Sequence, residues 1–223
     1  MTYKAIIFDC DGVLVDSEVL GLDASANYLR EHGFSWTPAD LVRLFTGYRD
    51  DVFKEKLVEE YQRIHTTTPD DAFFEGLVDE RRSRRHLLTT INGAEDAIAA
   101  MSLPIAVASS SRTEFLHGKL KRVGLFDQLS PHIYSADLVA HGKPAPDIFL
   151  YTAEKLSIAP ERCLVIEDSV NGVRAGLAAN MTVWGFTGGS HCFEGHGERL
   201  RDAGASLVVE TFDQLTSALH RAP

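Results

Sequence analysis

Two aspartates separated by a single residue follow a short apolar run near the start of the sequence. The run Ala5-Ile6-Ile7-Phe8 leads into Asp9-Cys10-Asp11-Gly12. Two carboxylates at the end of a buried strand repel each other in a partly desolvated site, so a cation is expected between them. Mg²⁺ fits this role because it prefers oxygen ligands and leaves positions for phosphate oxygens. Without further signals, the same two residues could simply cap a turn.

Three later motifs carry groups that could act with these carboxylates. Ser109-Ser110-Ser111 follows another apolar run and precedes a helical pattern, where hydroxyls and backbone N–H groups can hold an anion. Lys143 stands in the stiff segment Gly142-Lys143-Pro144-Ala145-Pro146-Asp147, which could aim its charge at a phosphate. Glu167-Asp168-Ser169 ends a third apolar run and supplies two more carboxylates. Taken singly, each motif also has a plain structural explanation, as a helix cap or as a solvated surface charge.

The elements that would position these motifs alternate along the chain. Short apolar runs without polar alternation predict strands that are buried on both faces of a parallel sheet, at residues 5–8, 105–108, 164–166, 182–184 and 207–209. Helical patterns lie between them, at residues 114–123, 146–156, 170–179 and 212–219. This alternation predicts an α/β doubly wound fold with a parallel sheet, in which ligands bind beyond the carboxyl ends of the strands.

Residues 17–88 break the alternation, because they show helical signals only. Thr37-Pro38-Ala39-Asp40 and Thr68-Pro69-Asp70-Asp71 each place a hydroxyl at the N-cap, proline at the first helical position and an acid in the first turn. The pattern predicts an all-helical segment over 17–88, inserted into an α/β core that is formed by residues 1–16 and 89–223.

Composition narrows the classes of partner. The chain has 223 residues, of which 44% are hydrophobic, and its 22 Lys and Arg against 32 Asp and Glu give a net charge of −10. Nucleic acids and anionic membranes are therefore not expected as partners, because both require clustered positive charge. The odd number of cysteines, Cys10, Cys163 and Cys192, favours a reducing compartment and a cytoplasmic protein. The oligomeric state is left open by the sequence.

Taken together, the four motifs resemble those of the haloacid dehalogenase-like superfamily, and the branch that contains phosphoglycolate phosphatase-like and β-phosphoglucomutase-like enzymes. The matching stretches are DxDGxxxDSE at 9–18, the serine at 109, GKPxPDIF at 142–149 and EDSxxGxxAG at 167–176. The resemblance implies the strand order 5-4-1-2-3, with the strand before Asp9 in the centre. It also implies a helical cap after the first motif, with hinges near residues 15–17 and 88–92.

The resemblance further implies phosphoryl transfer through an aspartyl-phosphate. Asp9 would attack phosphorus, and Asp11 would first donate a proton to the leaving alkoxide and then remove one from water. Mg²⁺ would be held by Asp9, the main-chain carbonyl of Asp11, Asp168 and, directly or through water, Glu167. The phosphate oxygens would contact Ser109, the Ser110 backbone and Lys143. The expected function is a Mg²⁺-dependent phosphatase for a small phosphorylated metabolite, such as a sugar, polyol or sugar-acid phosphate.

Two alternatives stay open at this point. β-Phosphoglucomutases carry a histidine four residues after the position of Ser17, and here that position is Gly21, which favours hydrolysis over a mutase. A phosphosugar-binding protein without turnover would be expected to lack Asp9 or Asp11, and both are present. Gly47 and Arg49 are the candidate substrate-binding residues of the cap, although the arginine stands one place earlier than in the mutases.

Two further features could be structural or functional. The run Arg81-Arg82-Ser83-Arg84-Arg85-His86 could be a solvated helix face or could steer anionic substrates. His191, Cys192 and His196 loosely suggest a site for a soft metal, but no fourth ligand stands at a familiar interval.

Overall fold

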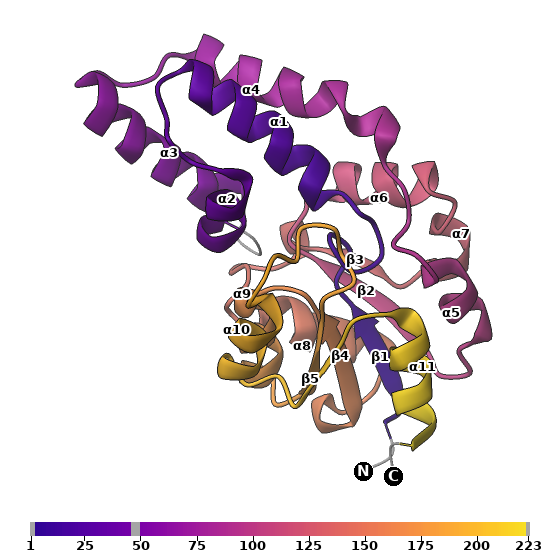
Figure 1. The fold of residues 1–223 in the computed structure, drawn as a ribbon. Coiled ribbons are helices and arrows are strands. Elements are labelled where there is room, and N and C mark those ends of the chain that lie inside the picture. The colour runs from indigo at the N-terminus through magenta and orange to yellow at the C-terminus, as the bar shows by residue number, and fades with distance from the viewer. Residues whose placement is uncertain (1–2, 46–49, 222–223) are drawn as a thin grey trace.

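A parallel sheet of six strands forms the centre of this computed structural model, which describes residues 3–45 and 50–221 (Figure 1). The strand order is β3-β2-β1-β4-β5-β6. The strands are β1 (Ala5–Phe8), β2 (Ile105–Ser109), β3 (Ile133–Ser135), β4 (Cys163–Glu167), β5 (Thr182–Phe186) and β6 (Leu207–Val209). The order 5-4-1-2-3 is confirmed for the first five strands, and β6 extends the sheet beyond β5.

Helices cover both faces of the sheet (Figure 1). On β1, Ile6 and Phe8 pack in one hydrophobic cluster, whereas Ala5 and Ile7 pack in another. The first cluster includes residues of α5 (Ala94–Ala100), α6 (Thr113–Arg122), α7 (Phe126–Leu129) and α11 (Phe212–Arg221). The second includes residues of α8 (Asp147–Leu156), α9 (Val170–Ala178) and α10 (His196–Asp202). Since successive strand residues point to opposite faces, the uninterrupted apolar runs follow directly from this double burial.

The sequence did not predict β3, α5 or α10. β3 has only three residues at the edge of the sheet, and Tyr134 in its middle is partly exposed. α5 and α10 have seven residues each, which is too short for a helical period to stand out. Three short 3₁₀ helices complete the described elements: η1 (Arg85–Leu87), η2 (Ala136–Leu138) and η3 (Pro160–Arg162).

A helical segment lies between β1 and α5, at the top of Figure 1. Its helices are α1 (Glu18–Glu31), α2 (Pro38–Phe45), α3 (Asp50–His65) and α4 (Asp71–Ser83). They share a hydrophobic cluster that is separate from the two clusters of the sheet, and Leu29, Phe34 and Phe73 belong to it. The segment therefore has a core of its own.

The chain enters and leaves this helical segment at adjacent points. Val15 forms an antiparallel bridge with Thr90, and the N–H of Asp16 donates to the carbonyl of Thr89 at 3.0 Å. The N–H of Ile91 donates to the carbonyl of Leu14, also at 3.0 Å. These bonds hold residues 14–16, which lead into the helical segment, beside residues 89–91, which lead out of it.

The two expected helix starts have different outcomes. Thr37 caps α2 as expected, since its Oγ1 accepts from the N–H of Asp40 at 3.2 Å and its own N–H donates to the Asp40 carboxylate at 3.0 Å. The prediction that Thr68 caps the later helix is wrong. Asp70 is the N-cap and accepts from the N–H of Phe73 at 2.9 Å, because a carboxylate there also meets the positive end of the helix dipole.

The remaining general features are simple. Cys10, Cys163 and Cys192 are all free thiols. None of the helices within residues 3–45 and 50–221 combines the length and apolarity that crossing a bilayer would need.

Most of the arginine run lies on the exposed side of α4, where Arg82 pairs with Asp79 at 3.1 Å and Arg84 with Glu80 at 3.5 Å.

Candidate active site

The carboxyl ends of β1, β2 and β4 bring three of the sequence motifs to one edge of the sheet. β1 lies between β2 and β4, with Phe8 paired to Val107 on one side and to Ile166 on the other. The N–H of Asp9 donates to the carbonyl of Ile166 at 3.0 Å, which fixes Asp9 beside the end of β4. This edge is where a parallel sheet of this order opens a crevice for a ligand.

Lys143 links these strand ends. Its Nζ donates to Asp9 Oδ1 at 2.5 Å, to Glu167 Oε1 at 2.6 Å and to the carbonyl of Ala108 at 2.9 Å. The side chain is 1% exposed, and its ammonium lies 4.9 Å from the centre of the Phe149 ring. The three donors of the ammonium group are therefore all used, two of them on carboxylates.

Charge and burial act strongly on Asp9 and Lys143. Burial raises the pKa of Asp9 well above its ordinary value, with the neighbouring acids Glu167, Asp168 and Asp11 adding to the effect and Lys143 opposing it. Burial alone would lower the pKa of Lys143, but Asp9 and Glu167 outweigh it and raise that pKa above its ordinary value. Lys143 is therefore positively charged, and its single charge cannot neutralise all of the neighbouring acids Asp9, Glu167, Asp168 and Asp11.

Glu167 is completely buried and both of its carboxylate oxygens are engaged. Oε1 accepts from Lys143, and Oε2 accepts from the N–H and the hydroxyl of Ser169, each at 2.9 Å. Ser169 also caps α9, because its Oγ accepts from the N–H of Gly172 at 3.0 Å. A Cβ on Gly172 would lie 1.7 Å from Glu167 Oε1, so the helix can approach the carboxylate only with glycine there.

Asp168 offers a buried carboxylate oxygen, Oδ2, that lies beside His191 and makes no hydrogen bond to the described residues. Nε2 of His191 lies 2.8 Å from this oxygen, outside hydrogen-bonding geometry. Burial, with Glu167 adding to it, raises the pKa of Asp168 above its ordinary value. A buried carboxylate oxygen without a hydrogen bond, beside Asp9 and the Asp11 loop, fits the hard oxygen set that Mg²⁺ prefers.

Gly12 lets the loop after β1 approach Asp168. Its φ is +77°, and a Cβ there would lie 2.1 Å from Asp168 Oδ2 and 2.5 Å from His191 Cε1. We expect Gly12→Ala to reduce turnover by at least about tenfold, because the added methyl would displace an oxygen proposed to bind metal. Gly124→Ala is the matched control, since Gly124 has φ +80° but nothing within 4 Å of its Cβ position.

Both alanine variants should lose about 1–2 kcal/mol of unfolding free energy from the left-handed backbone alone. Only Gly12→Ala should lose more than that and also lose activity. Thermal unfolding and phosphate release on the same preparations measure both effects. Equal stability losses with full activity in both variants would contradict the role given to the close contact at Gly12.

Asp11 is held by contacts on both carboxylate oxygens. Oδ1 accepts from Ser17 Oγ and Lys119 Nζ, and Oδ2 accepts from Ser111 Oγ at 2.9 Å. Burial favours the neutral acid, but the contacts with Lys119, Ser17 and Ser111 outweigh it and lower the pKa of Asp11. The ligand-free site therefore stabilises the carboxylate form, which can accept a proton.

The expected phosphate-binding residues lie around the end of β2. Ser109 is fully buried and its Oγ accepts from the N–H of Ser111 at 3.1 Å. Ser110 stands between them in the turn before α6 and is half-buried. Lys143 reaches the same strand end through the Ala108 carbonyl. The candidate cap residues Gly47 and Arg49 lie outside the described residues.

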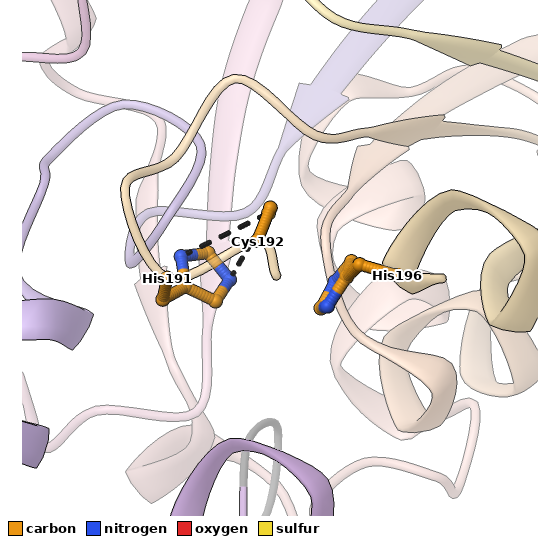
Figure 2. A group of neighbouring side chains, drawn as sticks. All are labelled: His191, Cys192 and His196. Carbon is orange, nitrogen blue, oxygen red and sulfur yellow. Dashed lines mark hydrogen bonds between the residues drawn. The ribbon is translucent and has the colours of Figure 1, made fainter. Parts of the chain in front are cut away.

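His191, in the loop after β5, and His196, at the start of α10, both lie beside Asp168. Ligand atoms of His191, Cys192 and His196 lie within 4.8 Å of one another. Figure 2 marks hydrogen bonds between His191 and Cys192, and the rings of His191 and His196 meet edge to face with their centres 5.4 Å apart. Nε2 of His196 donates to the carbonyl of Asp168 at 2.6 Å, and Nδ1 accepts from Arg199 at 2.9 Å. Both nitrogens of His196 are thus occupied, one of them by a cation.

The two histidines have opposite electrostatic surroundings. Burial lowers the pKa of His191, but its contact with Asp168 outweighs burial and raises the pKa to about 11. Burial lowers the pKa of His196 to about 4, so this ring is neutral at physiological pH. His191 is accordingly a cation placed against Asp168, whereas His196 is a neutral donor that fixes the backbone after β4.

Four residues of this region were not assigned to the site by the sequence patterns: Ser17, Ser111, Lys119 and His191. Ser111 and Ser17 lie inside motifs that were recognised, so their positions could have suggested a role. Lys119 follows no strand and stands among other charged residues on α6, where it looks like part of a solvated helix face. Only the folded structure brings it to Asp11.

Known proteins are similar to this chain over most of its length. A family model for haloacid dehalogenase-like hydrolases matches residues 3–180. Phosphorylated carbohydrates phosphatase from Thermotoga maritima is 28% identical over 225 residues, which cover 93% of this chain and 94% of that protein.

Two solved structures are similar along their whole length. A HAD family hydrolase from Deinococcus radiodurans R1, solved with bound phosphate and sodium, is 34% identical with a TM-score of 0.81, over 98% of this chain and 96% of that one. The haloacid dehalogenase-like protein ATU0790 from Agrobacterium tumefaciens is 33% identical with a TM-score of 0.87, over 98% of both chains. The likeness therefore includes the helical segment as well as the sheet.

Proposed function

Because this chain belongs to the haloacid dehalogenase-like hydrolases, we propose that it is a Mg²⁺-dependent phosphatase that acts on small phosphorylated carbohydrates through an aspartyl-phosphate. The observation that carries the proposal is Lys143 bound between Asp9 and Glu167, next to the unbonded oxygen of Asp168. The Thermotoga maritima relative, named for phosphorylated carbohydrates, supports the substrate class of sugar, polyol or sugar-acid phosphates.

In the first half of the proposed reaction, a carboxylate oxygen of Asp9 attacks phosphorus. The bond between Asp9 and phosphorus forms as the bond from phosphorus to the leaving oxygen breaks, and Asp11 gives its proton to that oxygen. Since its contacts with Lys119, Ser17 and Ser111 favour ionised Asp11, we propose that the proton arrives with the substrate, as a singly protonated phosphate ester can bring it.

In the second half, water attacks phosphorus and the bond to Asp9 breaks, which releases inorganic phosphate. Asp11 takes the proton from the attacking water and passes it to the departing inorganic phosphate, which returns Asp11 to its ionised starting state. Ser109 and the Ser110 backbone would hold the phosphate oxygens throughout, and Lys143 would turn the donor that contacts Asp9 to a phosphate oxygen once Asp9 bonds to phosphorus. Bound Mg²⁺, held by Asp9, the Asp11 carbonyl and Asp168, would supply positive charge for those oxygens. Glu167 would act through water, because both its oxygens are already engaged.

We also propose that residues 17–88 form a cap over a core of residues 1–16 and 89–223. The separate hydrophobic cluster of the helices and the paired strands at Val15 and Thr90 support this division. Ser17, at the start of the segment, reaches Asp11 in the core. Movement of the helical segment would therefore change the contact between Ser17 and Asp11, the proposed acid. That Gly47 and Arg49 bind the substrate from this cap stays a prediction.

The function is tested by following phosphate release from a panel of phosphate esters with Mg²⁺ present. We expect hydrolysis of sugar, polyol or sugar-acid phosphates and no activity in EDTA. The panel should include a hexose 1-phosphate, whose products separate the alternatives. Free sugar with inorganic phosphate supports a phosphatase, whereas the 6-phosphate isomer would identify a mutase and overturn the proposal. Binding without any turnover would identify a phosphosugar-binding protein.

Mg²⁺ binding should be visible without any substrate. At about 100 times its dissociation constant, Mg²⁺ is expected to stabilise the fold by about 2.7 kcal/mol, which raises the thermal midpoint by about 5–10 °C. Asp168→Asn should remove most of this shift, because it takes away the charge of the unbonded oxygen. Asp202→Asn, an exposed change at the end of α10, is the control and should keep it. A full shift in Asp168→Asn would place the metal elsewhere.

A further inference from the structure

A second lysine reaches the site from α6. Lys119 contacts Asp11 Oδ1 through its ammonium group, and Nζ also donates to Ser111 Oγ at 2.9 Å. Ser111 Oγ in turn donates to Asp11 Oδ2 at 2.9 Å. One hydroxyl can accept from the lysine and donate to the carboxylate at the same time, so the three groups form a closed ring of contacts.

Lys119 is not an ordinary lysine of a helix surface. Its side chain is 15% exposed and that of Asp11 is 17% exposed, so the pair is largely withdrawn from solvent. Lys121, two residues later on α6, is exposed and lies with its ammonium 4.7 Å from the centre of the Phe126 ring. A lysine side chain loses rotamer entropy when its ammonium group is held in one place. An exposed ion pair contributes too little free energy to offset much of that loss. The partly buried ring of Lys119, Ser111 and Asp11 therefore calls for an explanation.

The contacts on Asp11 come from two different parts of the fold. Ser17 belongs to the connection into the helical segment, whereas Ser111 and Lys119 belong to the loop and helix that follow β2. If the helical segment moves, Ser17 moves with it, but Ser111 and Lys119 stay with the sheet. Lys119 and Ser111 are thus placed to keep the Asp11 carboxylate fixed relative to Asp9 in any position of the helices.

We propose that Lys119 is a positioning residue, which acts through Asp11 and, with Ser111, keeps this carboxylate aimed at the oxygen that exchanges a proton. The proposal rests on the function proposed above. Lys119 would not itself bind phosphate or Mg²⁺, since its ammonium is directed at Asp11 and Ser111, while Lys143 faces Asp9 and Glu167.

If Lys119 acts through Asp11, replacing Lys119 should slow the steps in which Asp11 transfers a proton and leave the other steps nearly unchanged. A sugar alkoxide leaves phosphorus only with a proton, whereas p-nitrophenolate is a good leaving group and needs little help. Lys119→Met should slow the release of sugar from a sugar phosphate by at least about tenfold, but change the burst of p-nitrophenol from p-nitrophenyl phosphate by less than about threefold. Breakdown of the phosphorylated enzyme should be slow with both substrates, because it uses Asp11 as the base.

The experiment compares Lys119→Met, Asp11→Asn and the double variant by rapid-quench and steady-state kinetics. We expect a lower kcat with little change in KM for Lys119→Met. In the Asp11→Asn background the same change should cost less than about twofold, since the residue through which it acts is already gone. Lys119→Arg should recover much of the rate, and Lys121→Met is the matched control that should match the unaltered protein.

Each other outcome overturns the proposal. Losses that multiply in the double variant would show that Lys119 acts independently of Asp11. A raised KM with unchanged kcat would make it a substrate-binding residue. Equal losses with both leaving groups and no recovery by arginine, together with a lower thermal midpoint, would make its role structural. If the unaltered protein releases no phosphate from any ester, the proposed function fails first and this proposal fails with it, a result that differs from turnover with multiplying losses.

Discussion

Asp9→Asn is expected to lower phosphatase turnover by about four orders of magnitude or more without lowering the thermal stability of the protein. The amide has the shape of the carboxylate but cannot form the phosphorylated intermediate. Because the folded-state pKa of Asp9 is raised, ionising it costs stability as the pH rises through that value. At neutral pH the neutral asparagine removes this cost, so the thermal midpoint in EDTA should stay equal or rise.

The measurement pairs phosphate release with thermal unfolding in EDTA, and Asp202→Asn serves as a carboxylate-to-amide control on the surface. Mass spectrometry of the acid-quenched protein should find a phosphoryl group on the unaltered enzyme and none on Asp9→Asn. Turnover within tenfold of the unaltered protein, or phosphorylation of the variant, would remove Asp9 from the role of nucleophile.

Lys143→Met is expected to damage both stability and activity. The change removes the buried charge that contacts Asp9 Oδ1 and Glu167 Oε1, and leaving a buried partner uncompensated costs about 3–5 kcal/mol. The thermal midpoint should fall by about 10 °C in EDTA. Turnover should fall by about 10²–10³, because a charge directed at the phosphate oxygens is lost as well.

The free energy of unfolding should depend on pH differently in the unaltered protein and in Lys143→Met. Since the pKa of Lys143 is raised above its ordinary value, its contribution to stability is constant below about pH 10 and is lost only as the pH rises through the folded-state value. In the variant, lowering the pH from 8 to 5.5 should recover stability, because the raised pKa of Asp9 lets it take up a proton, which relieves its repulsion with Glu167. Lys155→Met, an exposed change on α8, should show neither effect. A variant that unfolds at the same temperature as the unaltered protein would contradict the assignment of Lys143 as the neutralising charge.

Much of the fold and of the candidate site could be predicted from the sequence because the informative residues follow strand ends. The apolar run before Asp9 is buried on both sides, which leaves little choice of element, and Glu167 ends the neighbouring strand after a similar apolar run. Parallel strands bring their carboxyl ends together, so motifs that are distant in sequence could be placed at one edge. The short edge strand β3 lacked this signal.

The remaining part of the site depends on tertiary contacts. Lys119 has the sequence context of a solvated lysine, and only the packing of α6 against the sheet turns it toward Asp11. His191 shows a similar limit: its neighbours in sequence suggested a soft metal, whereas its Nε2 faces Asp168. The error at Thr68 has a local cause, because two residues two places apart could each cap the helix and the carboxylate of Asp70 is the better cap.

If residues 17–88 form the cap that we propose, the paired crossing at Val15 and Thr90 would make that cap a replaceable part of the molecule. Both ends of the segment start from one small patch, as the ends of a surface loop do, so a different set of helices could be grafted there without moving β1 or its neighbours. Such a graft would keep the phosphate chemistry of the sheet edge and change the surface that meets the rest of the substrate. We therefore expect chimaeras joined at this crossing to fold and to inherit the substrate range of the helical donor.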